Sequence, residues 1–410
     1  MRKTRITPIL GLGCATALVV GVSGAVPAAA AQAAAQAGKQ QPSAYVPYGG
    51  QLNSVAVSSG KAWTVGPTPV LQYWNGKTWT ESRMNANLLK YADLPGFYSV
   101  AAVSGSSAWA VGYLPAGNDG YSSVIARYSG GTWTRVASPN PGAAGTFLDG
   151  VAATSADNAW AVGTVYGAPR AETAILHWNG KSWTRVSSPS PGNDQLAGVT
   201  ATSATNAWAV GATQNLTTGV DSILILHWNG KAWTRVSGPA GTAGITFDAG
   251  GITATSASNA WIVGTQDSKT LILHWNGKIW TPVASPSPGS ASGLTSGLVS
   301  VAATSASNAW AVGTAEAPAP VGTAHGTHTL ILHWNGKAWS LVSSPNPSCS
   351  TCDSLFGVAA ASTTSAWAVG TVNAGGLVVM LHWNGKAWAN FQSANELVTG
   401  NTGNTGSTGK

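Results

Sequence analysis

Four aspartates have the residue type and the placement to do chemistry together. Asp149, Asp194, Asp248 and Asp353 each lie just before a short apolar strand that recurs along the chain. If these strands line one channel, the four carboxylates meet at its mouth, where they could bind a cation or a polar ligand. Two of them could also supply the carboxyl pair of a glycosidase. No Asp-x-Asp-x-Asp-Gly spacing predicts a dedicated calcium loop, and solubility is the simpler role.

Five histidines occupy one recurring strand position: His177, His227, His274, His333 and His382. Ligands of one zinc ion must converge on it, whereas these five fall in five separate repeats. We therefore predict buried, hydrogen-bonded histidines. His325 and His328 form a looser pair on a variable loop, and the sequence offers no third ligand. No metal and no other cofactor is predicted.

The one close cysteine pair is Cys349 and Cys352. In an exported chain such a pair favours a disulfide, and a redox role would need a helix in a βαβ setting that the pattern does not predict. No nucleophile elbow, Walker loop, dinucleotide fingerprint or HExxH motif is present. The sequence therefore singles out no catalytic residue.

A twelve-residue motif organises the whole chain. It runs from Ile175 to Val186, with close copies ending at Trp233, Trp280, Trp339 and Trp388 and looser ones at Trp79 and Trp133. Asn179-Gly180 between two strand-like runs favours a two-residue type I′ turn, with positive φ at both positions. That turn would place Trp178 opposite Lys181, where a weak cation–π contact could form. Both faces carry apolar groups, so both should be covered.

A second pair of strands precedes each copy of this motif, as in 150–155 followed by 159–163. Four short strands per repeat at this period are typical of a β-propeller blade. We predict an all-β, seven-bladed propeller with four antiparallel strands per blade over residues 50–392. All four strands of a repeat should belong to one blade, without an exchange of strands between the two ends of the ring.

All 20 tryptophans fall inside this repeat. They could form an aromatic platform for sugars or cations. Fixed strand positions with both faces covered favour packing between blades instead. We therefore interpret the repeated tryptophans as structural, among them Trp160, Trp178, Trp183, Trp208, Trp228 and Trp233.

The two termini differ from the repeat. Residues 1–31 have a basic start, an apolar run and small residues at Ala28–Ala30, typical of a signal peptide. Residues 32–49 are an Ala/Gln-rich linker, and 393–410 are a Gly/Asn/Thr-rich tail that we expect to be disordered. We expect a secreted monomer with no membrane span in the mature chain. Without the leader the net charge is about +4, and no dense basic stripe predicts nucleic-acid binding.

Charge should separate between the two ends of the propeller. One end carries the tight turns, with Lys61, Lys77, Lys181, Lys231, Lys278, Lys337 and Lys386. The other end carries long variable loops, with Asp93, Asp119, Asp149, Glu172, Asp194, Asp221, Asp248, Asp267, Glu316 and Asp353. Variable loops on a rigid scaffold are frequent binding sites, whereas evenly spaced lysines favour a solvated surface.

The repeat resembles secreted bacterial seven-bladed propellers with Asp-box or kelch-like motifs. Gly180 and Trp183 match the glycine and tryptophan of the Asp-box, but Trp178 stands where its aspartate should be. The residues that sialidase or copper-oxidase propellers require are not identifiable here, so this resemblance implies a fold and no activity.

The leading hypothesis is an exported, non-catalytic binding or surface-interaction module, because a full propeller lacks a recognisable catalytic set. Its partner would be an extracellular glycan, a cell-wall polymer or a protein. A second hypothesis is a glycosidase or lyase that uses the carboxylates at the channel mouth. A third is a structural protein of the cell envelope.

Overall fold

The computed structural model describes residues 50–391, except 68–69, 90–94, 117–119, 143, 168, 241–245, 318–325, 347–352 and 373–376. The predicted signal peptide, linker and tail lie outside the described residues. So do Cys349 and Cys352, and the predicted disulfide therefore stays a prediction. In the described part, no helix has the length and apolarity to cross a membrane.

Nearly all regular structure is β-strand, arranged in consecutive antiparallel groups of four. The first sheet contains β1 (Ser54–Ser58), β2 (Lys61–Val65), β3 (Leu71–Trp74) and β4 (Trp79–Glu81). Four later sheets repeat this order. They are β14 (Asn193–Ser203), β15 (Asn206–Gln214), β16 (Asp221–Trp228) and β17 (Trp233–Val236); β18 (Thr246–Ser256), β19 (Asn259–Gln266), β20 (Lys269–Trp275) and β21 (Trp280–Pro282); β22 (Ser296–Ser305), β23 (Asn308–Ala317), β24 (Gly326–Trp334) and β25 (Trp339–Leu341); and β26 (Ser354–Ser362), β27 (Ser365–Val372), β28 (Leu377–Trp383) and β29 (Trp388–Asn390). We call each such group a blade.

One sheet has nine strands and departs from this pattern. It contains β6 (Gly96–Ser104), β7 (Ser107–Ala116), β8 (Gly120–Ser129) and β9 (Thr132–Val136), followed by β10 (Gly145–Ser155), β11 (Asn158–Tyr166), β12 (Glu172–Trp178) and β13 (Trp183–Arg185). A parallel pair, Gly145 with Tyr121, joins β10 to β8. The ninth strand, β5 (Arg83–Met84), runs parallel to β9 and leads into the short helix α2 (Ala86–Leu89). The other described helix is the 3₁₀ turn η1 (Ser290–Ser292).

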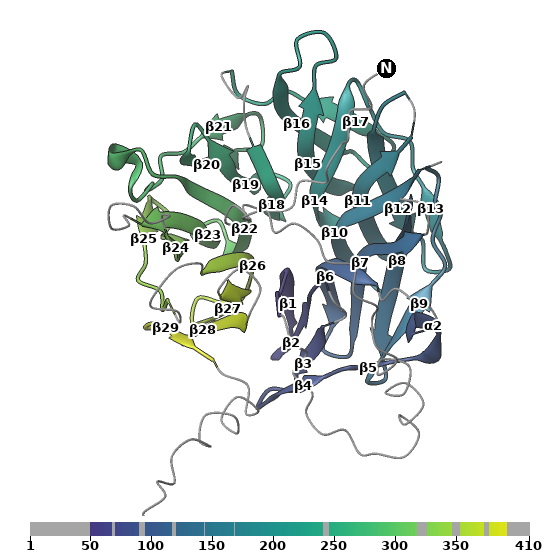
Figure 1. Ribbon diagram of the computed structural model, residues 1–410, viewed down its shortest axis with the longest axis horizontal. Helices are drawn as coiled ribbons and strands as arrows, with labels where there is room; N and C mark the ends of the chain where they lie inside the picture. Colours follow the sequence, from purple (N-terminus) through teal and green to yellow (C-terminus); the bar gives the residue numbers. More distant parts are fainter. Residues whose placement is uncertain are drawn as a thin grey trace, which may run out of the picture.

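The first strands of the blades form a closed ring (Figure 1). They contact one another in the order β1, β6, β10, β14, β18, β22 and β26, and β26 returns to β1. At the closure, the Leu52 amide donates to the Gly370 carbonyl at 3.2 Å. Every described blade is built from consecutive strands, as the sequence predicts. The fold is a β-propeller.

Tryptophans pack the seams between neighbouring blades. Trp160 of β11 lies 5.0 Å from Trp228 and 5.1 Å from Trp233 of the next blade, measured between ring centroids. Trp367 makes the same contacts with the hairpin tryptophans of β3 and β4 and so closes the ring. The packing interpretation of the tryptophans therefore agrees with the structure.

The Asn-Gly hairpins differ from the predicted turn. Trp178 pairs with Trp183, so the loop has four residues and the predicted register was wrong by two. The Asn179 side chain explains the difference, because its Oδ1 accepts the amides of Lys181 and Ser182, each at 3.0 Å. Only Gly180 then needs a positive φ, at 90°. A shift of two residues keeps each side chain on its predicted face.

The predicted contact between Lys181 and the tryptophans is not found. Lys181 is exposed, and the cation–π contact among the described residues is that of Arg127 over Trp109. The type I′ geometry occurs instead at Gly130-Gly131 between β8 and β9, where both residues have positive φ.

The repeated histidines are hydrogen-bonded, as predicted, but half-buried. His177 Nε2 lies 2.8 Å from Asn158 Oδ1, and its ring stacks on Trp160 at 4.2 Å. The copies at His227, His274 and His333 repeat both contacts, and His382 meets Ser365 instead. Burial lowers the pKa of all five imidazoles.

Candidate functional site

The structure does not place the four predicted aspartates at equivalent positions. Asp194 lies in β14 opposite Thr213, and Asp353 just before β26; both side chains are fully buried. Asp149 is half-buried and lies in the bulge of β10, between the paired residues Leu148 and Gly150. Asp248 lies in β18, but its side chain is outside the described part of the structure. Of the three aspartates whose side chains are described, only Asp149 is therefore exposed enough to contact a ligand.

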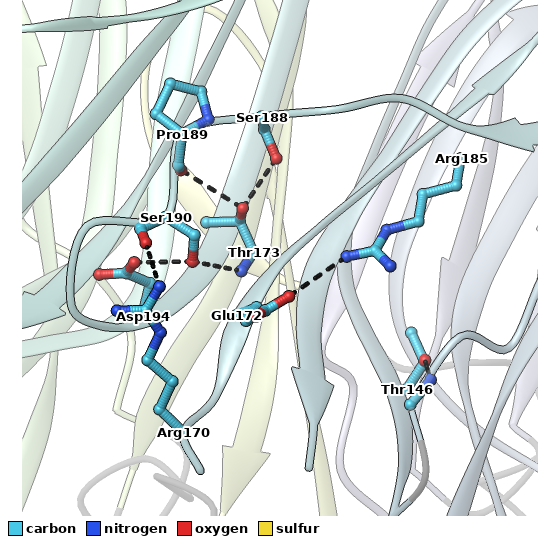
Figure 2. A network of polar contacts seen from close by, with 10 residues as sticks. Thr146, Arg170, Glu172, Thr173, Arg185, Ser188, Pro189, Ser190 and Asp194 are labelled. Carbon is cyan, nitrogen blue, oxygen red and sulfur yellow. Dashed lines mark hydrogen bonds and ion pairs between the residues drawn. The ribbon is translucent and has the colours of Figure 1, made fainter. Parts of the chain in front are cut away.

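Figure 2 shows that Asp194 is hydrogen-bonded within the connection that leads into β14. Its Oδ2 accepts the Ser190 hydroxyl at 2.7 Å and the Gly192 amide at 3.0 Å. The Arg170 guanidinium donates to the Ser190 carbonyl at 3.0 Å, and the Ser190 hydroxyl accepts the Thr173 amide. These bonds tie the connection between β13 and β14 to the start of β12. Full burial and local bonding favour a structural role for Asp194.

A related set of hydrogen bonds between a strand and the segment after the fourth strand recurs in four blades, and it was not predicted. Thr173 Oγ1 lies 2.7 Å from the Ser188 hydroxyl and also donates to the Pro189 carbonyl. The same contacts join Ser123 to the segment at Ser138, Thr270 to that at Ser285, and Thr329 to that at Ser344. The sequence signal is Ser-Pro-x-Pro, which follows the fourth strand in four blades.

A cluster of aromatic residues lies near Asp149. Phe147 stacks on Tyr113 with ring centroids 4.1 Å apart, and it meets Tyr98 edge-on at 5.3 Å. Tyr121 packs against both Tyr113 and Phe147, at 5.2 and 5.8 Å. Tyr166 completes this group, because Asp149 and Tyr121 both act electrostatically on its hydroxyl. We call Tyr98, Tyr113, Tyr121, Phe147, Asp149 and Tyr166 the tyrosine–aspartate cluster.

The tyrosine–aspartate cluster is largely neutral below about pH 7. Burial raises the pKa of the Asp149 carboxyl to about 7 and, with help from Asp149, that of Tyr166 to about 12. The pKa of Tyr98 is raised by burial, by Tyr113 and by Asp149. A protonated Asp149 and the phenols both donate and accept hydrogen bonds. The cluster therefore presents half-buried aromatic rings together with neutral hydroxyl groups.

Long strands bring the tyrosine–aspartate cluster together. β7 and β8 have ten residues each, and Tyr121 near the start of β8 pairs with Gly145 of the next blade. Gly145 has φ 116°, and a Cβ there would lie 2.0 Å from the Tyr121 carbonyl oxygen. Glycine is required at this crossing, which merges two blades into the nine-stranded sheet. The cluster thus lies at the junction of two blades, where the pattern of separate four-stranded sheets is interrupted.

Sequence analysis missed the tyrosines, although the alignment of repeats contains a signal. Tyr113 follows Gly112, whereas the matching glycines of the later blades are followed by threonine or alanine. Tyr98 and Asp149 occupy the same bulge position in successive blades, after Phe97 and Leu148. Tyr113 is therefore a large residue at a position that is small in the later blades, and Tyr98 and Asp149 are polar at a position occupied by apolar residues in the later blades whose bulge is described. Their convergence depends on the crossing of β8 to β10, which no local pattern predicts.

Tyr98 is poorly suited to act as a general base. A tyrosine base needs a pKa near the working pH, whereas the neighbours of Tyr98 raise its pKa. Burial accounts for the shift of Asp149, and no second described carboxylate contributes to it. Among the described residues, no group of three His, Cys, Asp or Glu could hold a metal ion.

Comparison with known proteins supports the fold alone. No protein-family model and no curated protein matches the sequence. Among solved structures, YCF48 from Cyanidioschyzon merolae is similar, with TM-score 0.53 and 16% identity over 83% of this chain and 98% of that chain. A YCF48 structure bound to D1 peptide gives 0.51 and 14% over 81% and 93%. An ulvan lyase of a polysaccharide lyase family, bound to a sulfated saccharide, gives 0.55 and 11% over 87% and 99%.

Proposed function

We propose that the chain is an exported, non-catalytic binding module that binds an extracellular or cell-wall carbohydrate chain at the tyrosine–aspartate cluster. The proposal rests mainly on the packing of Tyr98, Tyr113 and Tyr121 against one another, with Asp149 near Tyr98 and Tyr166. These residues come from two neighbouring blades and depart from the repeat. Sugar rings stack on aromatic faces, and their hydroxyls pair with neutral donors and acceptors such as these.

The architecture behind this proposal is a propeller of seven blades. The nine-stranded sheet contains two complete blades, β6–β9 and β10–β13, connected by one parallel residue pair. Counting them separately agrees with the seven copies of the sequence motif. The basic, apolar and small-residue pattern of residues 1–31 supports export.

A glycosidase or lyase is the second candidate, and one observation favours it. A carboxyl whose pKa is about 7 can act as a general acid or base near neutral pH. Glycoside hydrolysis also needs a second carboxyl group within about 10 Å, and Asp194 is fully buried in its own loop. The binding module is therefore the better supported function.

The test is a screen of the full chain against neutral, uronic-acid and sulfated polysaccharides, with released products measured in the same wells. The Tyr98→Phe/Tyr113→Phe variant removes two hydroxyls and keeps both rings, and Lys231→Ala at the tight-turn end is the control. We expect retention without product release, weakened in the tyrosine variant and unchanged in the control. Product release would establish the enzyme instead. If no polysaccharide is retained, the carbohydrate proposal fails and a protein partner becomes the next candidate.

A further inference from the structure

Four blades share a histidine–asparagine pair in their seams, and the β6–β9 blade replaces both residues. In the β10–β13 blade, His177 bonds to Asn158, whose amide in turn donates to Thr154. Strand register places Arg127 at the histidine position, because it pairs with Trp109 as His177 pairs with Trp160. Ser107 and Val103 occupy the asparagine and threonine positions by the same alignment. At the histidine position this blade therefore has an arginine cation. The residues at the asparagine and threonine positions are a short serine and an apolar valine.

The Arg127 side chain lies over Trp109 and has one buried N–H without a partner in the described part of the chain. Its guanidinium carbon lies 5.2 Å from the centre of the Trp109 ring. Its Nε is buried and has no hydrogen-bond partner there, and the same holds for the Ser107 hydroxyl. A half-buried guanidinium has five N–H donors, and leaving such groups unpaired is costly. The seam therefore holds a guanidinium N–H and a hydroxyl that both lack a partner among the described residues.

The geometry favours an anion as that partner. Ser107, Trp109 and Arg127 project from one face of the β7–β8 pair, because Trp109 and Arg127 are directly opposite and Ser107 is two residues away. Stacking on tryptophan holds the guanidinium plane, and its fork of N–H groups fits the paired oxygens of a carboxylate or sulfate. The adjoining turn has two glycines, Gly130 and Gly131, around which the space is open. Unlike the Asn-Gly-Lys turns of the other repeats, this turn has no lysine that could repel an arginine or compete for an anion.

We propose that Arg127 and Ser107 form a binding site for an oxyanion group, such as the carboxylate of a uronic acid or a sulfate. Arg127 would donate two parallel hydrogen bonds and Ser107 a third. Arg127 lies six positions after Tyr121 in β8, about 20 Å along a strand. The site is therefore distinct from the tyrosine–aspartate cluster, and it stands or fails independently of the proposed function.

The experiment measures the melting temperature of the full chain in rising sulfate, with sodium chloride adjusted to constant ionic strength. A second arm uses free glucuronate, which separates a sugar acid from an inorganic ion. Arg127→Gln removes the charge. Ser107→Asn/Arg127→His installs the pair found in the β10–β13 blade and should fold normally. Arg235→Gln, at an exposed arginine of β17, is the matched control.

We expect a saturating rise in melting temperature for the natural chain and the Arg235 variant, because a ligand that binds only the folded state stabilises it. Affinity should fall about tenfold or more in Arg127→Gln, since a hydrogen bond to a charged group is worth about 1.5–3 kcal/mol. The Ser107→Asn/Arg127→His variant should lose the response and melt higher than the natural chain without anion. An equal response in that variant would show a general salt effect and overturn the proposal, as would no saturating response to either anion in the natural chain.

Discussion

The seam between the β10–β13 and β14–β17 blades and the tyrosine–aspartate cluster use aromatic residues in opposite ways. In the seam, Trp160 is buried against two tryptophans and a hydrogen-bonded histidine. In the cluster, Tyr98 and Tyr113 stay half-buried, and the Tyr98 hydroxyl lies near Tyr113 and Asp149. The seam is copied around the ring, whereas the cluster occurs once among the described blades. The comparison teaches that repetition supplies stability here and that departures from it mark the candidate site.

The largest effect should follow from breaking a seam. Trp208→Ala removes a side chain that is 1% exposed and packs on Trp275 at 4.8 Å. Cavities of this kind cost about 3–5 kcal/mol, so urea unfolding should show a loss of that size. Leu216→Ala, at a residue that is 63% exposed, is the control and should change stability by less than about 0.5 kcal/mol. Equal effects of the two changes would contradict the packing role.

The next effect should follow from breaking the crossing that builds the cluster. Gly145→Ala adds a Cβ 2.0 Å from the Tyr121 carbonyl oxygen, in a left-handed region that costs about 1–3 kcal/mol by itself. Gly219 has φ 71° and open space around it, so Gly219→Ala measures the backbone cost alone. Gly145→Ala should lose more unfolding free energy than this control and also lose carbohydrate binding. If the two variants match in both properties, the crossing does not position the cluster.

A smaller effect, with a defined pH dependence, should come from Asp149. Its pKa is raised from 3.8 to about 7, so the folded chain binds more protons than the unfolded chain between these values. Unfolding free energy should therefore fall as pH rises through this window. A half-buried position leaves some screening, and we expect a loss of about 1–2 kcal/mol relative to Asp149→Asn.

Chemical unfolding of the natural chain and of Asp149→Asn from pH 4 to 8 tests this prediction. The quantity compared is the difference in unfolding free energy between the two chains at each pH. Asp221→Asn, at an exposed aspartate, is the control and should track the natural chain. A difference that grows toward low pH would reverse the predicted sign.

The smallest effect per residue should come from the seam histidines. Burial lowers the pKa of His227, so the unfolded chain binds more protons below the ordinary histidine pKa of about 6.5. The stability that neutral His227 contributes is present above that pH and is lost as pH falls. In acid unfolding, His227→Gln should show a shallower loss than the natural chain. An unchanged slope would mean that this imidazole titrates alike in both states.

The seams could be predicted from sequence because their determinants are local and repeated. Alternation placed Trp178 and His177 on opposite faces, and this survived an error of two residues in the register. That error arose because the Asn179 side chain replaces two turn hydrogen bonds. The candidate site could be predicted only in part. Asp149 was identified, but its tyrosines meet through the contact of Tyr121 with Gly145, which joins two repeats and leaves no local pattern.

The most direct test of the central claim is to titrate a polysaccharide retained in the screen against three forms of the full chain. These are the natural chain, Tyr113→Ala in the cluster, and Trp228→Ala in a seam, where the tryptophan is half-buried. Affinities are measured at a temperature at which all three forms remain folded. We predict that Tyr113→Ala weakens binding about tenfold or more, as expected when stacking worth about 1–3 kcal/mol is lost, and that Trp228→Ala leaves affinity unchanged. Loss of affinity in Trp228→Ala with full affinity in Tyr113→Ala would place binding in the repeat and contradict the account.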